Sequence, residues 1–495
     1  MTGDTPKQPN VLFIVMDTAR YADVFSSGPV VMPKLQEIAS EGATFQNAFA
    51  NAPWTVPSHG SMFTGQYPSD HGAHAGTKRF VPDTPAIAEL FQKTGYRTGA
   101  FSNNTWLSPA FGFHRGFETF QTRWELFEGG SDLAGVAKAE GIRGKFRALL
   151  GTLADREVPL TIANFIYAAS LSYRSTEDSG AHRTTGRVID WLDAADNRPF
   201  FGFVNYVEPH LQYDPPAEYR ERFLPEGMAP ERLDHVNQDP WGYLAGEVEM
   251  SDRDFEALLA LYRAELRYLD TQIERLYEQI ERDDILDETA IVIVGDHGEN
   301  VGEHGLMDHQ YCLYDTLMHV PCVIRYPAAF ASGTHVTGLV ELRDLFPTLL
   351  ELINFSIPEY PDVSTNSLAH PTEQSIGCEY VVAEYLAPQP SMTALSAKVG
   401  GELPKSVRRY DRALRALRTD RWKYVEGSDG SCELYDLSVD PPEHTDVSAE
   451  NPVVVDRLCN RLVADRGPFT PPGETTGADV DAMTERRLEN LGYLQ

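Results

Sequence analysis

The sequence predicts an α/β protein with a mostly parallel central sheet flanked by helices, followed by a small C-terminal α+β subdomain. Short apolar runs recur over residues 9–355, as expected for strands buried on both faces of a parallel sheet. Helical patterns alternate with these runs, which is the order that builds a parallel α/β sheet. The chain has 495 residues, 42% of them apolar, and can therefore bury one large core or two unequal ones.

The first elements are predicted from four segments. Residues 9–16 (PNVLFIVM) form a short apolar run that ends at Asp17, as a central strand does when its carboxyl end presents a functional residue. Residues 32–42 place apolar side chains on one helical face and end in glycine. Residues 84–93 predict a second helix, and residues 95–102 predict a turn that leads into a strand.

Two further buried strands are predicted at residues 200–207 and 290–295 (AIVIVG), with a long helix over residues 252–282 between them. We assign residues 9–355 to one catalytic α/β domain. Residues 124–197 have a helical pattern and are expected to form an insertion over one side of the sheet.

The C-terminal part differs in composition. Residues 356–401 are rich in proline, serine and threonine without a clear period, which predicts a linker or an active-site loop. Residues 402–495 are expected to form the small subdomain. Its paired strands and its helix are predicted at residues 413–425, 433–437 and 452–464.

Charge narrows the set of partners. The net charge is −31, which disfavours binding to nucleic acid or to anionic membranes. Only nine of the 42 basic residues are lysine, a balance that resembles proteins of extreme halophiles. At low salt such an acidic surface would repel a substrate that is itself an anion. Molar salt shortens the Debye length to about 3 Å and would screen this repulsion. We expect a halophilic protein; an ordinary acidic protein is the alternative.

Cysteine use and hydropathy suggest where the protein resides. The five cysteines form no C-x-x-C pair, which predicts reduced thiols. No segment approaches the roughly 20 apolar residues of a membrane-spanning helix, and the N-terminus is too short and polar for a signal peptide. A cytoplasmic location is expected. Nothing in the sequence indicates the oligomeric state.

Four residues could form a metal-assisted nucleophilic site. An aliphatic hydroxyl is almost fully protonated at neutral pH and needs a cation at its oxygen to attack. Asp17 follows the first strand, Asp296 and His297 follow the strand at 290–295, and Thr55 begins a helix 38 residues after Asp17. Each residue alone is better explained as a cap or turn residue. Their common position at element ends favours a site.

One segment carries a family resemblance. The run from Thr55 to Gly65 (TVPSHGSMFTG) resembles the sulfatase signature C/S-x-P-S-R-x-x-L-x-T-G, in which the first residue is the nucleophile. Threonine cannot be oxidised to the formylglycine that sulfatases make from cysteine or serine, so this variant favours phosphoryl chemistry. Other segments resemble the sulfatase branch of the alkaline phosphatase superfamily in the same order, at residues 11–20, 199–216, 294–305, 313–321, 344–349, 416–424 and 433–441.

The resemblance implies one divalent metal ion held by Asp17, Asp296 and His297, with Thr55 completing the set. Thr18 stands where the family often has a second acid, which puts that ligand in doubt. An imidazole ligand suits a transition metal, so Mn²⁺ is favoured over Ca²⁺ or Zn²⁺. The Asp-His pair is similar to that of phosphonate monoester hydrolases and lipoteichoic-acid synthases.

Three histidines are candidates for catalysis. His59 stands at the arginine of the signature, His210 matches the substrate-binding histidine, and His309 stands where sulfatases often have a lysine. Histidine in place of arginine or lysine removes fixed charge and offers a proton donor for the leaving group. The alternative for each is a surface or capping histidine.

The expected function is hydrolysis of phosphoric, phosphonic or sulfuric esters through a covalent Thr55 intermediate, with phosphoryl chemistry favoured. The substrate would be a small anionic ester, on its own or on a glycan or lipid headgroup. A sulfuric ester hydrolase proper and a phosphoryl or headgroup transferase remain open alternatives. A non-catalytic anion-binding relative is a third, which the presence of Asp17, Asp296 and His297 disfavours.

Overall fold

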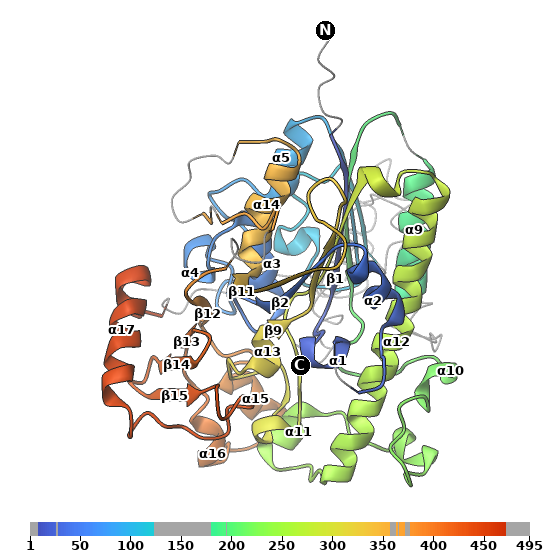
Figure 1. Cartoon of the computed structure of the whole chain (residues 1–495). Coiled ribbons are helices and arrows are strands. Elements are labelled where there is room, and N and C mark those ends of the chain that lie inside the picture. The colour runs from blue at the N-terminus through green and yellow to red at the C-terminus, as the bar shows by residue number, and fades with distance from the viewer. Residues whose placement is uncertain are drawn as a thin grey trace, which may run out of the picture.

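The computed structural model describes residues 8–25, 28–122, 180–194, 196–356, 363–364, 366–371 and 377–471. A nine-stranded sheet forms its centre (Figure 1). Its strands are β1 (Asn10–Met16), β2 (Ala43–Phe49), β3 (Arg97–Ser102), β4 (Thr119–Thr122), β5 (Phe200–Tyr206), β6 (Thr289–Gly295), β9 (His319–Val320), β10 (Cys322–Arg325) and β11 (Thr334–Glu341).

The strand order is β11-β2-β10-β6-β1-β5-β3-β4, and β9 pairs with β2. Strands β4, β3, β5, β1 and β6 run parallel to one another, and β11 is parallel to β2. Strand β10 is antiparallel to both β6 and β2. The mostly parallel sheet predicted from the sequence is therefore confirmed, and the predicted strands correspond to β1, β3, β5 and β6.

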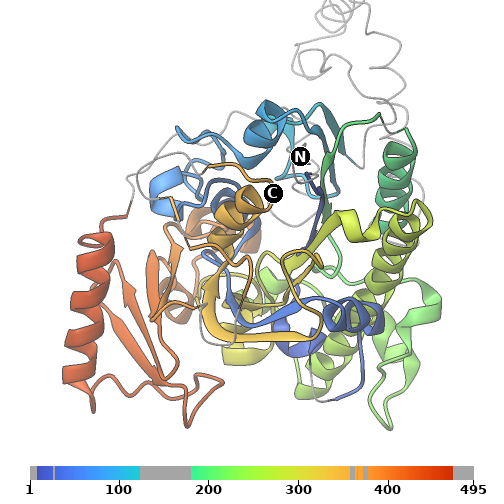
Figure 2. The ribbon, with the colours of Figure 1, turned by 45° about the horizontal axis from the view of Figure 1, so that its top comes forward.

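Helices cover both faces of the sheet (Figures 1 and 2). One face carries α12 (Asp252–Arg282), α9 (Ala181–Asp193) and α2 (Pro33–Ser40), and the other carries α3 (Thr55–Thr64), α5 (Ile87–Lys93) and α14 (Leu345–Leu352). Alternate residues of β1 point to opposite faces: Phe13 joins the apolar cluster beneath α3, whereas Ile14 joins the cluster beneath α12. Shorter helices are α1 (Tyr21–Val24), α4 (Pro68–His71), α10 (Ala217–Arg220), α11 (Pro240–Ala245), α13 (Asp315–Met318) and α16 (Lys405–Arg408).

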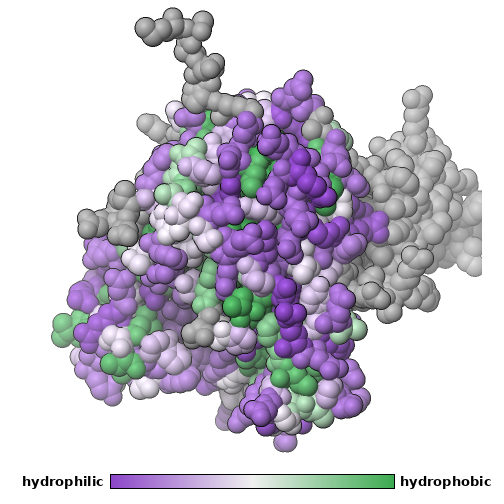
Figure 3. All heavy atoms as spheres, turned by 45° about the vertical axis from the view of Figure 1, so that its right-hand side comes forward, coloured by the Kyte–Doolittle hydropathy of each residue, from purple (hydrophilic) through white to green (hydrophobic). Residues whose placement is uncertain are grey.

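Helix α12 has the bounds that the sequence predicts, residues 252–282, because Ser251 caps its first turn. The insertion expected at residues 124–197 lies mostly outside the described residues, which include only its last part. There α9 packs along α12. The surface over these helices is mainly hydrophilic (Figure 3). Among the helices that the structure describes, none has the length and apolar character needed to cross a membrane.

A second sheet forms the C-terminal region. It consists of β12 (Val381–Tyr385), β13 (Leu414–Arg418), β14 (Trp422–Gly427) and β15 (Cys432–Asp436), all antiparallel, and α17 (Pro452–Arg466) packs on one of its faces. Residues 356–401, expected to lack regular structure, contain β12 and helix α15 (Met392–Val399). That expectation was wrong because β12 is only five residues long, and its pairing with β13 is a long-range contact that no local period reveals.

A buried ion cluster joins this second sheet to α13, which precedes β9 of the central sheet. The Lys423 ammonium on β14 lies 2.7 Å from Asp315 at the start of α13 and 2.7 Å from Glu443. The Lys423 side chain is 1% exposed. Removing one partner of such a cluster would leave uncompensated buried charge, so the cluster holds the two sheets in a fixed relation.

Asp270 on α12 gives a test of this packing. Its buried carboxylate accepts the backbone N–H groups of Lys34 and Leu35 at the start of α2, yet burial raises its pKa to about 6. The folded protein therefore keeps a proton that the unfolded chain has released between about pH 4 and pH 6. Wild-type stability should fall by on the order of 3 kcal/mol, relative to Asp270→Asn, as pH rises through this window.

Urea unfolding of both proteins at pH 4 and pH 7 measures this difference. Asparagine does not ionise in this pH range. The hydrogen bonds that Asp270→Asn alters therefore change the free energy of unfolding by the same amount at both pH values. A stability difference that does not depend on pH would contradict the raised pKa.

Candidate active site

Neighbouring strands bring the predicted metal ligands together. Strands β1 and β6 are parallel, and Met16 is in register with Gly295, so Asp17 and Asp296 leave the same edge of the sheet. Asp17, Asp296 and His297 are fully buried. They can each offer one ligand atom within 4.8 Å of the others.

Thr55 is the first residue of α3 and is fully buried. The Asn104 amide donates to Asp17 Oδ2 at 2.5 Å and to Thr55 Oγ1 at 3.2 Å. Ser58 on the same helix donates its hydroxyl to the Asp296 carbonyl at 2.7 Å. These bonds bring the Thr55 hydroxyl to the carboxylate cluster. Asn104 was not predicted; the only signal for it in the sequence is a run of polar residues after the buried strand β3.

The donor atoms of the cluster suit a divalent cation. Asp17 Oδ1, Asp296 Oδ2 and His297 Nε2 are buried and make no hydrogen bond in the part of the chain that the structure describes. His297 Nε2 lies 3.6 Å from Asp17 Oδ1 and 3.4 Å from Asp296 Oδ2. The Gly298 carbonyl lies 3.0 Å from His297 Nδ1, and accepting that N–H would leave Nε2 with its lone pair as a ligand.

The electrostatics of the cluster lead to the same conclusion. Burial, together with the Asp296 charge, raises the pKa of Asp17 well above its usual value, and burial raises the pKa of Asp296 to about 7. Burial lowers the pKa of His297 well below its usual value, which favours the neutral form that binds metals. Two buried carboxylates beside a neutral imidazole require a positive charge, which a divalent ion supplies.

His59 lies one helical turn after Thr55. Its Nδ1 donates to the Thr55 carbonyl at 2.9 Å and lies 3.5 Å from Asp296 Oδ2. The ring packs edge-on against Phe63 and Phe203, and burial lowers its pKa to about 3. A neutral imidazole in this position is consistent with a role in orienting the first turn of α3, and it argues against the proton-donor role that the sequence also suggested.

His309 lies between two acids. Its Nδ1 is 2.5 Å from Asp308 Oδ1 and 3.2 Å from Glu299 Oε1. Burial lowers its pKa, but the Asp308 and Glu299 carboxylates outweigh burial and hold it well above the usual value. His309 is therefore a cation at neutral pH, at the position where the family often has lysine.

His210 follows β5 and completes the group. Its ring centroid lies 5.1 Å from that of His309, which in turn lies 4.6 Å from that of His297. Burial, followed by the charge of His309, lowers the pKa of His210 to about 4. The site thus contains a charged imidazole, His309, beside a neutral one, His210. Two imidazoles in different protonation states suit the roles of acid and base. The structure brings together all seven residues predicted for the site.

Comparison with known proteins identifies the family. The sulfatase family model matches residues 9–355. The chain belongs to the sulfatase family. It is an ester-hydrolysing enzyme of α/β architecture.

Relatives resemble this sulfatase-family chain along most of their length. Arylsulfatase K of Bos taurus is 24% identical over 92% of this chain and 81% of its own. The choline-sulfatase of Rhizobium meliloti is 24% identical over 90% of this chain and 84% of its own. The phosphonate monoester hydrolase of Silicibacter pomeroyi shares the fold with a TM-score of 0.68, at 22% identity over 94% of this chain and 96% of that structure.

This member of the sulfatase family departs from the signature at Thr55 and His59, and also at Met62, which stands in place of leucine. The first two changes have different consequences in the structure. Thr55 keeps a hydroxyl at the cluster, whereas His59 carries no charge to the substrate. Positive charge near the reacting group is instead supplied by His309.

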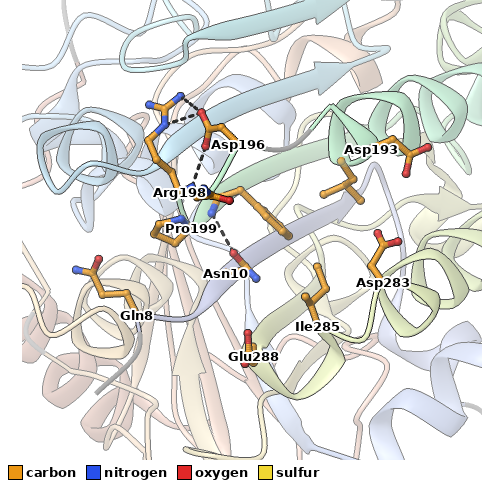
Figure 4. A pocket seen from close by; sticks show the side chains of 12 residues that line it. Gln8, Asn10, Asp193, Asp196, Arg198, Pro199, Asp283, Ile285 and Glu288 are labelled. Atoms are coloured by element: carbon orange, nitrogen blue, oxygen red, sulfur yellow. Dashed lines mark hydrogen bonds and ion pairs between the residues drawn. The ribbon is translucent and has the colours of Figure 1, made fainter. Parts of the chain in front are cut away.

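A cavity at the opposite edge of the sheet is a poor candidate for the sulfatase-family reaction. It encloses about 640 Å³ beside the start of β1 and β5 (Figure 4). Its one arginine, Arg198, is paired with Asp196 and Glu118, and its other charged residues are the acids Asp193, Asp283 and Glu288. An anionic ester would meet net negative charge there.

Proposed function

We propose that this enzyme is a metal-dependent hydrolase of phosphoric and phosphonic esters in which Thr55 is the nucleophile. The bond from Asn104 to both Asp17 and Thr55 is the observation that carries the proposal, because it brings an alcohol to a cluster of metal ligands. An alcohol held in this way needs no conversion to formylglycine.

Asp17, Asp296, His297 and Thr55 would hold the ion. A divalent cation there lowers the pKa of the hydroxyl and offsets charge that develops on the transferred group. Mn²⁺ is favoured, since a histidine ligand suits a transition metal better than it suits Ca²⁺.

The chain's own residues account for the remaining steps. Thr55 Oγ1 gives its proton to solvent water and forms a bond to phosphorus, while the bond from phosphorus to the leaving oxygen breaks and that oxygen takes a proton from the enzyme. His309, which its two acidic neighbours keep cationic, would give a proton to the leaving alcohol, and the neutral His210 would accept a proton from water in the second step.

Release of the product requires water to attack phosphorus. The threonyl ester carbon carries no second hydroxyl, so the ester cannot collapse to an aldehyde as a formylglycine hemiacetal does. Attack by water breaks the bond between phosphorus and Thr55 Oγ1 and restores the alcohol. An acceptor alcohol in place of water would make the same site a transferase.

Hydrolysis of sulfuric esters is the second candidate, because arylsulfatase K and a choline-sulfatase are among the relatives. A panel of p-nitrophenyl phosphate, p-nitrophenyl phenylphosphonate, bis-p-nitrophenyl phosphate and p-nitrophenyl sulfate separates the two. We expect kcat/KM for the best phosphorus ester to exceed that for the sulfate at least about tenfold, a difference of ~1.4 kcal/mol in the barrier.

The panel is run with Mn²⁺ at low and at molar KCl, together with elemental analysis of the purified protein. The acidic, lysine-poor composition is the reason for testing molar salt. A higher kcat/KM for the sulfate than for every phosphorus ester would reject phosphoryl preference. Product analysis with added alcohols distinguishes transfer from hydrolysis.

A further inference from the structure

Lys78 is a half-buried cation in the loop between α4 and α5. No carboxylate pairs with it in the part of the chain that the structure describes. Its Nζ instead lies over the Trp106 ring, 5.6 Å from the centroid. Lysines normally keep the ammonium in water or beside an acid, so a half-buried lysine whose contact is an aromatic face is unusual in a chain with only nine lysines.

The aromatic contact places Lys78 near the nucleophile. The Trp106 backbone N–H donates to Asn104 Oδ1 at 2.9 Å, and Asn104 contacts Thr55. Trp106 also packs edge-on against Trp54, with ring centroids 5.8 Å apart, and Trp54 directly precedes Thr55. Lys78 thus lies over one member of an aromatic pair, and both members are connected to Thr55.

The loop that carries Lys78 follows α4, which contacts α3. The ring of His71, the last residue of α4, lies 3.2 Å from the Ser61 hydroxyl of α3 and accepts the Ala73 backbone N–H of the loop at 3.1 Å. It also fills the space beside Gly60, where a Cβ atom would lie 2.6 Å from the ring. The Lys78 backbone N–H donates to the His74 carbonyl at 2.7 Å.

Lys78 also has a left-handed backbone, with φ of 50°. This conformation is uncommon for a residue other than glycine, asparagine or aspartate, and it costs of order 1 kcal/mol or more. Outliers of this kind cluster at ligand-binding sites, where the surrounding structure enforces them. Here the backbone bond from Lys78 to His74 is made in that conformation.

The charge of Lys78 is not compensated by the carboxylates of the metal-ligand cluster. Burial lowers its pKa, and among the residues that the structure describes no carboxylate, including those of Asp17 and Asp296, raises it. The reacting group already has the cluster and the cationic His309 around it. The ammonium of Lys78 is therefore available to a different part of the substrate.

We propose that Lys78 binds a second anionic group of the substrate, carried on the leaving-group side of the scissile ester. This inference rests on the proposed function and narrows it: the substrate class is an ester that has a carboxylate or a further phosphate beyond the reacting group. A lysine suits this task because its ammonium is a compact point charge that accepts varied anion geometry.

Binding of two inert analogues tests the proposal in the Mn²⁺-loaded enzyme. Benzylphosphonate and 4-carboxybenzylphosphonate have a methylene in place of the ester oxygen and differ only in the remote carboxylate. Calorimetry at fixed ionic strength should show that Lys78→Met weakens binding of 4-carboxybenzylphosphonate at least about tenfold, as expected for losing a charged partner. Binding of benzylphosphonate should change less than about twofold.

Two further variants serve as controls. Lys78→Arg keeps the charge and should restore most of the preference for the carboxylate. Lys93→Met removes an exposed lysine of α5 and should change neither affinity. Equal weakening of both ligands by Lys78→Met, or equal affinity of the wild type for both, would overturn the assignment.

The same ligands distinguish failure of this inference from failure of the proposed function. A wild-type enzyme that cleaves no phosphorus ester but keeps a Lys78-dependent preference for the carboxylate refutes the hydrolysis and supports the Lys78 assignment. A wild-type enzyme that cleaves such esters without this preference refutes the Lys78 assignment alone.

Discussion

Replacing Thr55 by alanine is expected to lower kcat/KM by about 10⁴-fold or more, because the variant has no atom that can form the covalent ester. Thr55 is fully buried at the start of α3, and alanine fits there without new contacts. We therefore expect the fold to persist. Steady-state kinetics on the best ester of the panel, with a thermal melt of the same preparation, measure both effects.

Thr55→Ser is the matched control for this variant. Serine keeps the hydroxyl within reach of Asn104 and should retain activity within about tenfold of the wild type, the smaller loss reflecting a less restricted rotamer. Wild-type activity in the alanine variant would show that another group is the nucleophile. Loss of activity in both variants with a normal melt would show that the methyl group matters more than the hydroxyl.

Removal of the divalent ion is expected to have an effect of similar size. Dialysis against a chelator should abolish measurable turnover, and Mn²⁺ should restore it, because a neutral threonine hydroxyl is a poor nucleophile. The ion should also raise the melting temperature. It would offset the repulsion between Asp17 and Asp296, whose pKa values are raised in its absence.

The rise in melting temperature is a readout that does not depend on activity. His297→Ala removes one ligand and should reduce the stabilisation by Mn²⁺, because fewer donors bind the ion less tightly. His335→Ala, in β11, is a control histidine far along the chain from the cluster and should leave the rise unchanged. An equal rise in wild type and His297→Ala would contradict the assignment of His297 as a ligand.

Local patterns in the sequence predicted the α/β class and four of the nine strands of the central sheet, but not β2, β4, β9, β10 or β11. Strands β1, β5 and β6 are buried on both faces and appear as apolar runs, and α12 shows a long apolar face. Strand β12 was missed because it is short and depends on its partner β13. Strand β10 was also missed, since its four residues carry little periodic signal.

The predicted site residues came from their positions at element ends and from the family signature. Asp17, Asp296 and His297 lie together because the strands before them are parallel neighbours. The family signature showed where His59 stands in the sequence but not which side chains surround it, so its role could not be decided from the sequence. Its neutral, apolar environment appears only when Phe63 and Phe203 pack around it.

The sequence by itself determined the family, the fold class and the residues offered as nucleophile and metal ligands. These features are carried by local patterns and by short motifs. Tertiary structure alone decided that Asn104 joins Thr55 to Asp17, that Asp308 and Glu299 keep His309 charged, and that Lys78 lies over Trp106. Charge state and hydrogen bonding depend on burial and on neighbours far away in the chain, which no local pattern contains.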